Sequence, residues 1–421
     1  MKAFARAAQA AAAAAIAATA MVGAAHADPL HISFWARDSE TAFAQKLVDG
    51  YNATQDKVHV DLTIVPGEAF PQKFGAAAAA GSSPDVASLD LVSVPYFASN
   101  NTLLDITDRA KTLPYLDTFD QAHISLSKWN DKFYALPFSA EASVLYYNKD
   151  LFKAAGLDPD KPPTTWDEIR ADAKKITALG DGIYGFYFSG ACAGCNLFVV
   201  SPYLYAAGAD DLTGGGAASD VDLNSPAAVS ALTFLNSLNQ DGSIAPDAKA
   251  DNGANFYSAF GTGKIGMQGG GAFGVNDLIQ NKKVNFGTTL IPGPTAGTYG
   301  SFSGGDTIVI PAGSQHVEEA WDFIKWATGD DAQKHFIADL GITPVRTDIA
   351  STYYAAKDPR YKTLADALKL GKTAKTLYAN QIFTDTSGPW LALLQQAIFG
   401  NDPKAAADAA QQKVLDIVNG N

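Results

Sequence analysis

Short alternating hydrophobic segments and longer helical patterns follow one another along the first part of the chain. Residues 30–35 and 58–65 have the period of two that is typical of strands, and residues 85–89 form a third short hydrophobic run. Between them, residues 39–52 and 68–80 have the spacing of helices. This β-α-β-α-β order predicts an α/β fold with a mostly parallel sheet covered by helices. Because such sheets bind ligands at the carboxyl ends of their strands, the loops after the first and third strands are the first candidates for a site.

A second α/β block is predicted farther along the chain. We expect a strand over 142–147 that leads into a helix ending at Gly156, where glycine permits a left-handed stop. The capping-box pattern from Thr165 to Glu168 opens another helix that extends to about residue 178. The remaining predictions are helices near 197–207, 226–240, 254–261 and 316–327, strands at 264–268 and 307–310, a surface loop over 209–220, and mostly helical structure from about 361.

The first 27 residues have the pattern of a secretory signal peptide. Lys2 and Arg6 precede an Ala-rich apolar run, and Ala25-His26-Ala27 places small residues at a cleavage site before Asp28. A transmembrane anchor is the alternative, but it needs about 20 strongly apolar residues and alanine is only weakly apolar. We expect cleavage after residue 27, a periplasmic location, and no lipid anchor, because no cysteine stands at the cleavage site.

Composition and charge narrow the class of protein. The 421 residues are 47% hydrophobic and 18% charged, which excludes disorder, and the length fits two large lobes. A formal net charge of −13 disfavours binding to nucleic acid or to an anionic membrane surface. No Gly-x-Ser-x-Gly elbow or His-Glu-x-x-His motif indicates a hydrolase.

The only cysteines, Cys192 and Cys195, are three residues apart. In an exported protein this pair favours a short-loop disulfide. A thioredoxin-type redox site is the alternative, but the strand-then-helix setting of such a site is missing from the local pattern. With no second cysteine pair, and with the six histidines scattered singly, we expect no metal site and no cofactor.

Several segments together resemble the family 1 extracellular solute-binding proteins of bacterial ABC sugar importers, the maltose-binding-protein-like group. The most specific is the run from Tyr147-Asn-Lys-Asp-Leu-Phe152 to Thr165-Trp-Asp-Glu168. The other matching pieces, in the order of the family, are Ile32-Ser-Phe-Trp35, Ser83-Pro-Asp-Val86, Leu103-Leu-Asp-Ile-Thr107, Gly263-Lys-Ile-Gly-Met267, Gly341-Ile-Thr-Pro-Val-Arg346 and Ser387-Gly-Pro-Trp390. They cover nearly the whole chain after the signal peptide.

The resemblance implies a two-lobed periplasmic-binding-protein fold of type II with discontinuous lobes. Its chain crossings are expected near 137–141, 301–306 and 341–347. The first lobe is then 28–139 plus 306–344, and the second is 140–305 plus 345–421. A ligand binds in the cleft, the lobes close by hinge motion, and the closed form is recognised by the membrane permease of an ABC importer. We expect the protein to be a monomer.

The segment after the first strand supplies polar groups that match sugar hydroxyls. Arg37, Asp38, Ser39 and Glu40 stand there, and at least one of them is expected to contact ligand. Helix N-capping by Asp38 or Ser39 is the alternative. Asp90 follows the third strand, in the loop that carries ligand contacts in the family.

Four candidates are expected from the second block. Glu141 lies at the first crossing, where the resemblance places a sugar-binding carboxylate, with a structural salt bridge as the alternative. Asn196 is a candidate ligand contact and also an ordinary helix cap. Gly270, within a glycine run, permits close approach of the backbone to a ligand. Phe273 falls where the family often has a stacking Trp, so this departure weakens the expected platform.

The last candidates belong to the later crossings and the carboxyl-terminal region. Gly305 and Asp306 lie at the second crossing and Arg346 at the third, where Arg346 is expected either to bind ligand or to pair with a hinge carboxylate. Trp390 matches a stacking Trp of the family, with packing between terminal helices as the alternative. The Arg that the family has one turn later is Leu394 here, so a different sugar orientation is expected.

These residues predict a receptor for a neutral sugar, with a di- or oligosaccharide favoured by the aromatic side chains, and no enzymatic activity. A polyol, a glycerol-phosphate-type ligand or ferric iron on the same fold is the alternative. Only Arg37 and Arg346 offer basic groups for a phosphate. Ferric-binding relatives use adjacent tyrosines, and the chain has the pairs Tyr146-Tyr147 and Tyr353-Tyr354, of which the first has the pattern of a packed strand. A secreted glycoside hydrolase using two of Asp90, Glu141 and Asp306 is the remote alternative.

Overall fold

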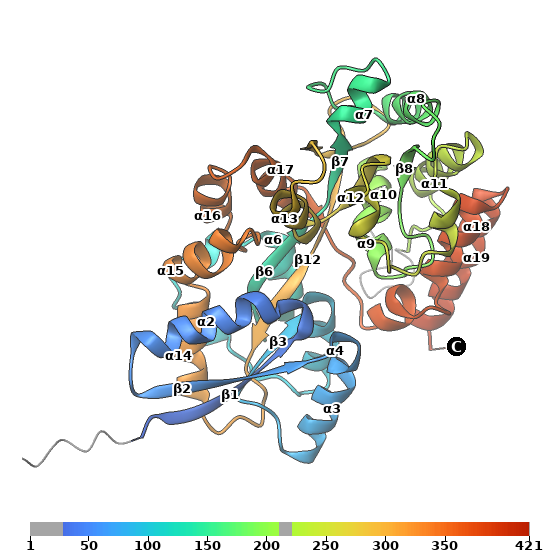
Figure 1. Cartoon of the computed structure of the whole chain (residues 1–421). Coiled ribbons are helices and arrows are strands. Elements are labelled where there is room, and N and C mark those ends of the chain that lie inside the picture. Colours follow the sequence, from blue (N-terminus) through green and yellow to red (C-terminus); the bar gives the residue numbers. More distant parts are fainter. Residues whose placement is uncertain (1–27, 210–220, 421) are drawn as a thin grey trace, which may run out of the picture.

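The computed structural model describes residues 28–209 and 221–420, and it has two principal β-sheets, each flanked by helices (Figure 1). The predicted signal peptide and all but the first residue of the predicted loop at 209–220 lie outside the described residues. Within the described part of the chain, no helix combines the length and the apolar character that crossing a membrane requires.

The first sheet has the strand order β11-β12-β3-β1-β2, and β6 and β13 also pair with β12. β1, β2 and β3 run parallel, as the alternation predicted, while β12 runs antiparallel to β3 and to β6. The strands are β1 (Leu30–Arg37), β2 (Val58–Val65), β3 (Val86–Asp90), β6 (Leu136–Ala142), β11 (Ile291–Pro292), β12 (Tyr299–Val309) and β13 (Gly371–Lys372).

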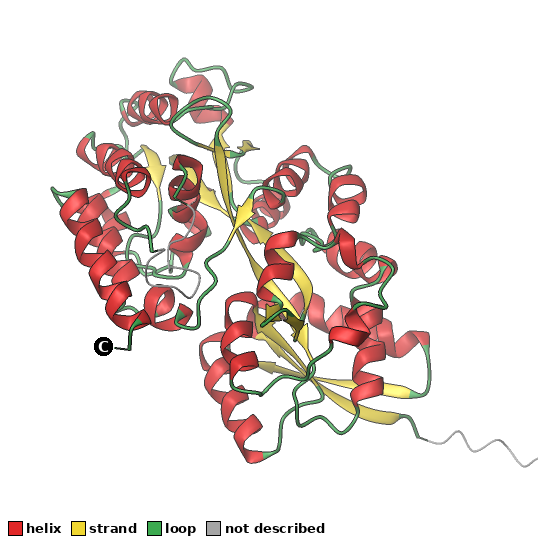
Figure 2. Cartoon of the chain, turned by 180° about the vertical axis from the view of Figure 1, so that it is seen from behind, coloured by secondary structure: helices red, strands yellow, loops and turns green. Residues whose placement is uncertain are grey.

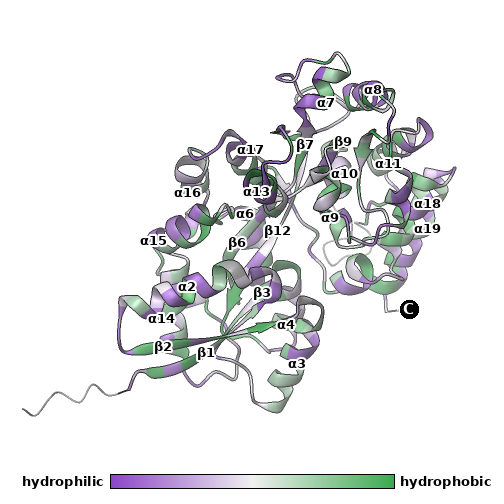
Figure 3. Ribbon diagram, in the orientation of Figure 1, coloured by the Kyte–Doolittle hydropathy of each residue, from purple (hydrophilic) through white to green (hydrophobic). Residues whose placement is uncertain are grey.

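Two apolar layers cover the two faces of this sheet. On one face, Phe34 packs against α2 (Thr41–Thr54) and α14 (Val317–Ala327), and its ring lies 5.4 Å from that of Phe323. On the other face, Leu89 packs with side chains of α3 (Phe70–Ala80) and α4 (Val94–Ser99). Hydrophobic and hydrophilic residues are interleaved along outer helices such as α2 and α19 (Pro403–Val418) (Figure 3), as expected for amphipathic helices.

The second sheet has the order β10-β7-β9-β8, and most of the helices of the second block surround it. Its strands are β7 (Val144–Asn148), β8 (Tyr184–Tyr187), β9 (Ile265–Gly270) and β10 (Phe286–Thr289). The surrounding helices are α7 (Lys149–Ala154), α8 (Trp166–Thr177), α9 (Cys195–Val199), α10 (Ser201–Ala207), α11 (Pro226–Gln240), α12 (Ser258–Gly261), α13 (Ala272–Asn281), α17 (Pro359–Leu368), α18 (Pro389–Phe399) and α19.

Most predicted elements are present, and the differences lie at their ends. The helix predicted over 254–261 is helical only in α12, and the strand predicted at 307–310 is the end of the much longer β12. β12 is longer because its first half pairs with β11 and β13 and its second half with β3 and β6, so partners remote in sequence extend it.

β6 and β12 connect the two sheets, and Figure 2 shows them passing between the two parts of the molecule. Ala140 lies opposite Gly305 of β12, and its backbone N–H also donates to the carbonyl of Thr343 at 3.0 Å. The first predicted crossing segment therefore contacts the other two. The exact lobe boundaries stay a prediction.

Candidate ligand-binding site

The guanidinium of Arg37 lies at the carboxyl end of β1 between two carboxylates. Its Nη1 donates to Asp90 Oδ2 at 3.1 Å, and its Nη2 donates to Asp306 Oδ1. These three side chains meet because β1 and β3 are parallel neighbours whose ends coincide, and because Asp306 of β12 lies in register with Asp90. Ser139 Oγ donates to the second oxygen of Asp306 at 3.3 Å.

Burial and neighbouring charges shift the pKa values of the ionisable side chains in this cluster. Burial alone lowers the pKa of Arg37, but the carboxylates of Asp306, Asp90 and Glu40 outweigh it and raise that pKa above its ordinary value. The guanidinium therefore stays charged. Burial, and then the charge of Asp306, raise the pKa of Glu40 well above its ordinary value. Glu40 is fully buried, where Ser88 Oγ donates to its Oε1 at 2.6 Å.

Glu141 of β6 contacts the amino end of α13 in the second block. Its Oε2 accepts from the N–H of Ala272 at 2.6 Å and its Oε1 from that of Phe273 at 3.2 Å. The approach depends on Gly271, because a Cβ at that position would collide with the Glu141 carboxylate. Burial raises the pKa of Glu141 to about 8, although the two backbone N–H groups oppose the shift. The carboxyl group is therefore largely protonated at neutral pH.

These side chains line a pocket of about 210 Å³ between the first sheet and the second block. Its wall combines polar groups with aromatic faces, the combination that a sugar with hydroxyls and apolar ring faces requires. The lining residues are Arg37, Ser39, Asp90, Glu141, Phe198, Phe256, Tyr257, Gly271, Phe273, Gly305 and Asp306.

A wider pocket of about 980 Å³ adjoins the first, and Arg37, Ser39 and Asp90 line both of them. Asp38 lies in the wall of the wider pocket, where its Oδ1 accepts from the N–H groups of Ser39 and Gly67 at 3.0 Å each. The carboxyl-terminal region contributes Asn380, Thr384, Asp385 and Thr386 to the same wall.

Eight predicted site residues thus lie in the walls of the two pockets: Arg37, Asp38, Ser39, Asp90, Glu141, Phe273, Gly305 and Asp306. The structure places five others away from these walls, namely Glu40, Asn196, Gly270, Arg346 and Trp390, and each has a packing or pairing partner that explains its position.

Asn196 and Gly270 are held inside the second block. The amide nitrogen of Asn196 donates to the carbonyls of Ser189 at 2.9 Å and Cys192 at 2.7 Å, and the residue is fully buried. Gly270 lies against the ring of Tyr146, with which a Cβ would collide. The glycine of this run that lines the pocket is the next one, Gly271.

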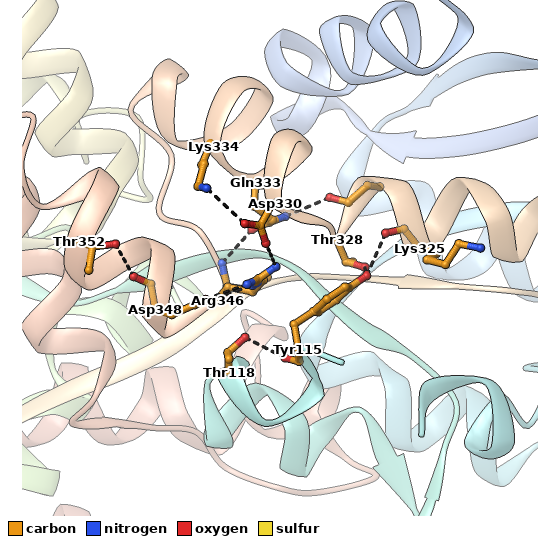
Figure 4. A network of polar contacts seen from close by, with 12 residues as sticks. Tyr115, Thr118, Lys325, Thr328, Asp330, Gln333, Lys334, Arg346, Asp348 and Thr352 are labelled. Carbon is orange, nitrogen blue, oxygen red and sulfur yellow. Dashed lines mark hydrogen bonds and ion pairs between the residues drawn. The ribbon is translucent and has the colours of Figure 1, made fainter. Parts of the chain in front are cut away.

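Arg346 belongs to a separate polar network near the third crossing (Figure 4). Its guanidinium pairs with Asp330, bonds to both oxygens of Asp348 at 3.2 and 2.7 Å, and lies 4.6 Å from the centre of the Tyr115 ring. This arrangement matches the hinge-carboxylate alternative in the sequence analysis. Trp390 is likewise fully buried and packs edge-on against Phe383 at 5.7 Å.

The sequence analysis did not identify Phe198, Phe256 and Tyr257 as pocket residues. Phe198 stands in an apolar helical run that reads as core, and Tyr257 precedes the short α12. The exposure of Tyr257, 48%, is unusual for a large aromatic residue, but only the structure reveals it. The predicted disulfide is confirmed, because Cys192 and Cys195 are bonded at the start of α9, the helix that carries Phe198.

Comparison with protein families gives a match to the family described as bacterial extracellular solute-binding protein over residues 37–334. A binding protein of Brucella abortus is 27% identical over 316 residues, covering 74% of this chain and 74% of that protein. The multiple sugar-binding protein of Streptococcus mutans is 26% identical over 340 residues, covering 76% of this chain and 77% of that protein. A shorter match, 30% identity over 158 residues, links the chain to the sn-glycerol-3-phosphate-binding periplasmic protein of Yersinia enterocolitica, with 37% of this chain and 35% of that protein covered.

Solved structures match over nearly the whole chain. The cyclic α-maltosyl-1,6-maltose binding protein of Arthrobacter globiformis has a TM-score of 0.78 at 25% identity, covering 93% of this chain and 100% of that one. The sugar-binding protein MalE of Xanthomonas citri has a TM-score of 0.81 at 22% identity, covering 93% and 98%. This agreement confirms the predicted two-lobed periplasmic-binding-protein fold.

Proposed function

We propose that this chain, which belongs to the bacterial extracellular solute-binding protein family, is the substrate-binding component of an ABC importer for a neutral sugar. The sugar binds in the two adjoining pockets and is delivered to a membrane permease. The multiple sugar-binding relative and the sugar-binding structural neighbours support this ligand class.

One observation carries the proposal: a guanidinium and three carboxyl groups converge on a pocket that also has aromatic walls. Asp90 and Asp306 accept from sugar hydroxyls, while Arg37 fixes both carboxylates in place. Phe273 and Tyr257 offer ring faces to the apolar side of a sugar. The wider pocket of about 980 Å³ gives room for further sugar units, which favours a di- or oligosaccharide.

The remaining parts of the proposal rest on the sequence pattern and on the family resemblance. We propose that residues 1–27 are a cleaved signal peptide, that the mature protein is a periplasmic monomer, and that the lobes are 28–139 plus 306–344 and 140–305 plus 345–421. Closure about the segments near Ala140 brings the two lobes together over the ligand.

A glycerol-phosphate-type ligand is the second candidate, since a shorter match to a glycerol-3-phosphate-binding protein favours it. The charges argue against it. Arg37 already pairs with Asp90 and Asp306, so a phosphate would meet an excess of negative charge in this wall. The tyrosine pair also argues against ferric iron. The hydroxyl of Tyr146 is buried and donates to the carbonyl of Gly271 at 2.7 Å, so it is not available as an iron ligand.

We also propose that the site has no glycosidase activity. Asp90 and Asp306 are paired with Arg37, and Glu141 is held by two backbone N–H groups, so the wall supports binding of hydroxyls. Turnover of a chromogenic glycoside would contradict this part of the proposal.

The test is the melting temperature of the protein, after unfolding and refolding to remove bound sugar, against a panel of sugars, polyols and glycerol phosphate. A ligand at about 100 times its dissociation constant stabilises the folded state by about 2.7 kcal/mol, which raises the melting temperature by a few degrees. We expect a shift with one saccharide and none with glycerol phosphate. A shift with glycerol phosphate or Fe³⁺ alone would keep the fold and overturn the ligand class.

A further inference from the structure

Two histidines that are far apart in the sequence lie opposite each other on the first sheet. In the parallel register of β1 and β2, His31 is the partner of His59, and Ser33 is the partner of Asp61. Residues two apart on a strand point to the same face, so Asp61 joins the two histidines there. The sequence analysis expected no metal site because it treated the histidines as separate, and the strand register brings two of them together.

The three side chains approach one another at the distances of a ligand set. His31 Nδ1 lies 2.7 Å from Asp61 Oδ2, and His59 Nε2 lies 3.7 Å from Asp61 Oδ1. Their ligand atoms all lie within 4.8 Å of one another, and no other group of three His, Cys, Asp or Glu side chains is this close in residues 28–209 and 221–420. A tetrahedral Zn²⁺ with bonds of about 2.0–2.1 Å places its ligand atoms about 3.3 Å apart. Binding of the ion would therefore replace the hydrogen bond between His31 Nδ1 and Asp61 Oδ2, while His59 Nε2 approaches from the side of the other oxygen, Oδ1.

This part of the sheet is open to solvent, although the same face is covered elsewhere. α3 and its neighbours pack over Val65, at the carboxyl end of the same strand, and Trp35 packs against that layer. Nearer the amino ends of the strands, the side chains of His31, His59 and Asp61 are 58%, 44% and 55% exposed. An ion can reach the group from solvent, and small side-chain rotations are free to complete its geometry.

We propose that His31, His59 and Asp61 bind one Zn²⁺ ion on the surface of the first sheet. Two imidazole nitrogens and one carboxylate oxygen are ligands that suit this ion, and three protein ligands leave a fourth position for water. The ion joins β1 to β2, which is the edge strand of the sheet, and so it stabilises that edge. The two strands lie side by side in the lower lobe of Figure 1.

The site is distinct from the sugar pockets. His31 precedes Arg37 by six residues on the same strand, a separation of roughly 20 Å at about 3.3 Å per residue. Zinc binding and sugar binding are therefore expected to be independent, so failure of this proposal would not affect the proposed transport function.

Isothermal titration calorimetry of the protein, prepared without a histidine tag and freed of metal by chelation, tests the proposal with Zn²⁺ as the probe. We expect one equivalent to bind, and the substitutions H59A and D61N each to weaken binding at least about tenfold, because each removes one of three ligands. Zinc should also raise the melting temperature of the parent protein but not that of H59A.

The control is H335A, because His335 also forms an exposed pair with a carboxylate, Asp339, at 3.0 Å, but without a second histidine. It should leave zinc binding unchanged. The absence of saturable binding, or equal binding by H59A, D61N and the parent, would overturn the proposal. Circular dichroism without zinc checks that the variants are folded, and the exposure of these side chains predicts that they are.

Discussion

The two arginines that the sequence offered as ligand contacts are both paired with two carboxylates, yet their surroundings differ. Arg37 and its partners Asp90 and Asp306 all line the same pocket. Arg346 has a side chain that is only 6% exposed, lies over the ring of Tyr115 and lines neither pocket.

The difference shows that pairing with acids does not by itself indicate a binding site. What distinguishes the two arginines is whether their carboxylate partners face a cavity or the solvent. At Arg37 they face a cavity in which a ligand can replace water as their hydrogen-bond partner. At Arg346 the carboxylate partners are 57% and 45% exposed to solvent and line neither pocket. There the same kind of pairing holds the third crossing against its neighbours.

The same contrast separates the two aromatic candidates, and it gives the largest expected effect. Trp390 is fully buried, whereas Phe273 lines the pocket. Trp390→Ala should lower the free energy of unfolding by about 4 kcal/mol, because it opens a cavity in the core. Phe273→Ala should lower it by about 1 kcal/mol and instead weaken sugar binding. Urea unfolding and calorimetry measure the two quantities.

Trp390→Phe provides a folded reference if the alanine variant does not accumulate. Sugar binding by the folded fraction should be unchanged in both Trp390 variants. A loss of affinity at Trp390 equal to that at Phe273 would mean that the buried ring contacts ligand in another conformation, and the contrast would fail.

The second prediction concerns the pH dependence of stability at Glu141. Its pKa is about 8 in the folded protein, against an ordinary value of 4.5. Between these values the folded state binds more protons than the unfolded state, so the free energy of unfolding falls as pH rises through this window. Glu141→Gln should therefore reduce the loss of stability between pH 5 and 8 by roughly 3 kcal/mol.

Urea unfolding of the parent and of Glu141→Gln at pH 5, 6.5 and 8 measures this change in slope. Glutamine keeps the size of the side chain and one carbonyl oxygen for the N–H of Ala272, but its NH₂ group cannot accept from the N–H of Phe273. The variant should therefore fold with a loss of stability that does not depend on pH, and the slope remains the readout. Glu40, whose pKa is also raised, leaves a residual slope in both proteins. Identical slopes would show that Glu141 is ionised in the folded state.

The third prediction tests the pocket arginine cluster directly. Asp306→Asn removes a charged acceptor for sugar hydroxyls and also the carboxylate that holds Arg37. We expect the affinity for the sugar identified by the melting panel to fall about 100-fold, equivalent to about 2.7 kcal/mol. Calorimetry measures it, with Asp348→Asn as the matched control, because Asp348 pairs with Arg346.

Asp348→Asn should change the affinity by less than about twofold, within the usual scatter of surface substitutions. Equal losses in the two variants would mean that both arginine clusters act on the ligand, either by contact or through closure of the lobes.

The sequence predicted the features that follow from local pattern and strand order. The loops that carry Arg37 and Asp90 are predicted as candidates because parallel sheets bind ligands at the carboxyl ends of their strands. The structure brings the two side chains together, because β1 and β3 are parallel neighbours. Glu141 and Asp306 were expected through the family resemblance, and both line the pocket.

The remaining outcomes depend on partners that are remote in the sequence. An asparagine at a helix start fits both a cap and a ligand contact, and only the carbonyls around Asn196 distinguish the two. The position of Arg346 depends on Tyr115, more than two hundred residues earlier. The approach of His31 to His59 depends on the register of two strands, which alternation alone does not fix.

The smallest effect is expected at the arginine of the third crossing. Arg346→Gln removes the pairing with Asp330 and Asp348, but both carboxylates are partly exposed and water can solvate them. The free energy of unfolding should fall by about 2 kcal/mol, below the usual loss for a fully buried pair. Affinity for the sugar should stay within about twofold of the parent.

Arg37→Gln is the matched variant, because it should cause a large loss of affinity. Its loss of stability should exceed that of Arg346→Gln, because it leaves the buried carboxylate of Asp306 without its partner. Arg346→Lys should recover part of the stability, since it keeps the charge but cannot bond to both oxygens of Asp348. If Arg346→Gln instead weakened sugar binding while leaving unfolding unchanged, the third crossing would be part of the binding site, and the distinction between the two arginines would no longer hold.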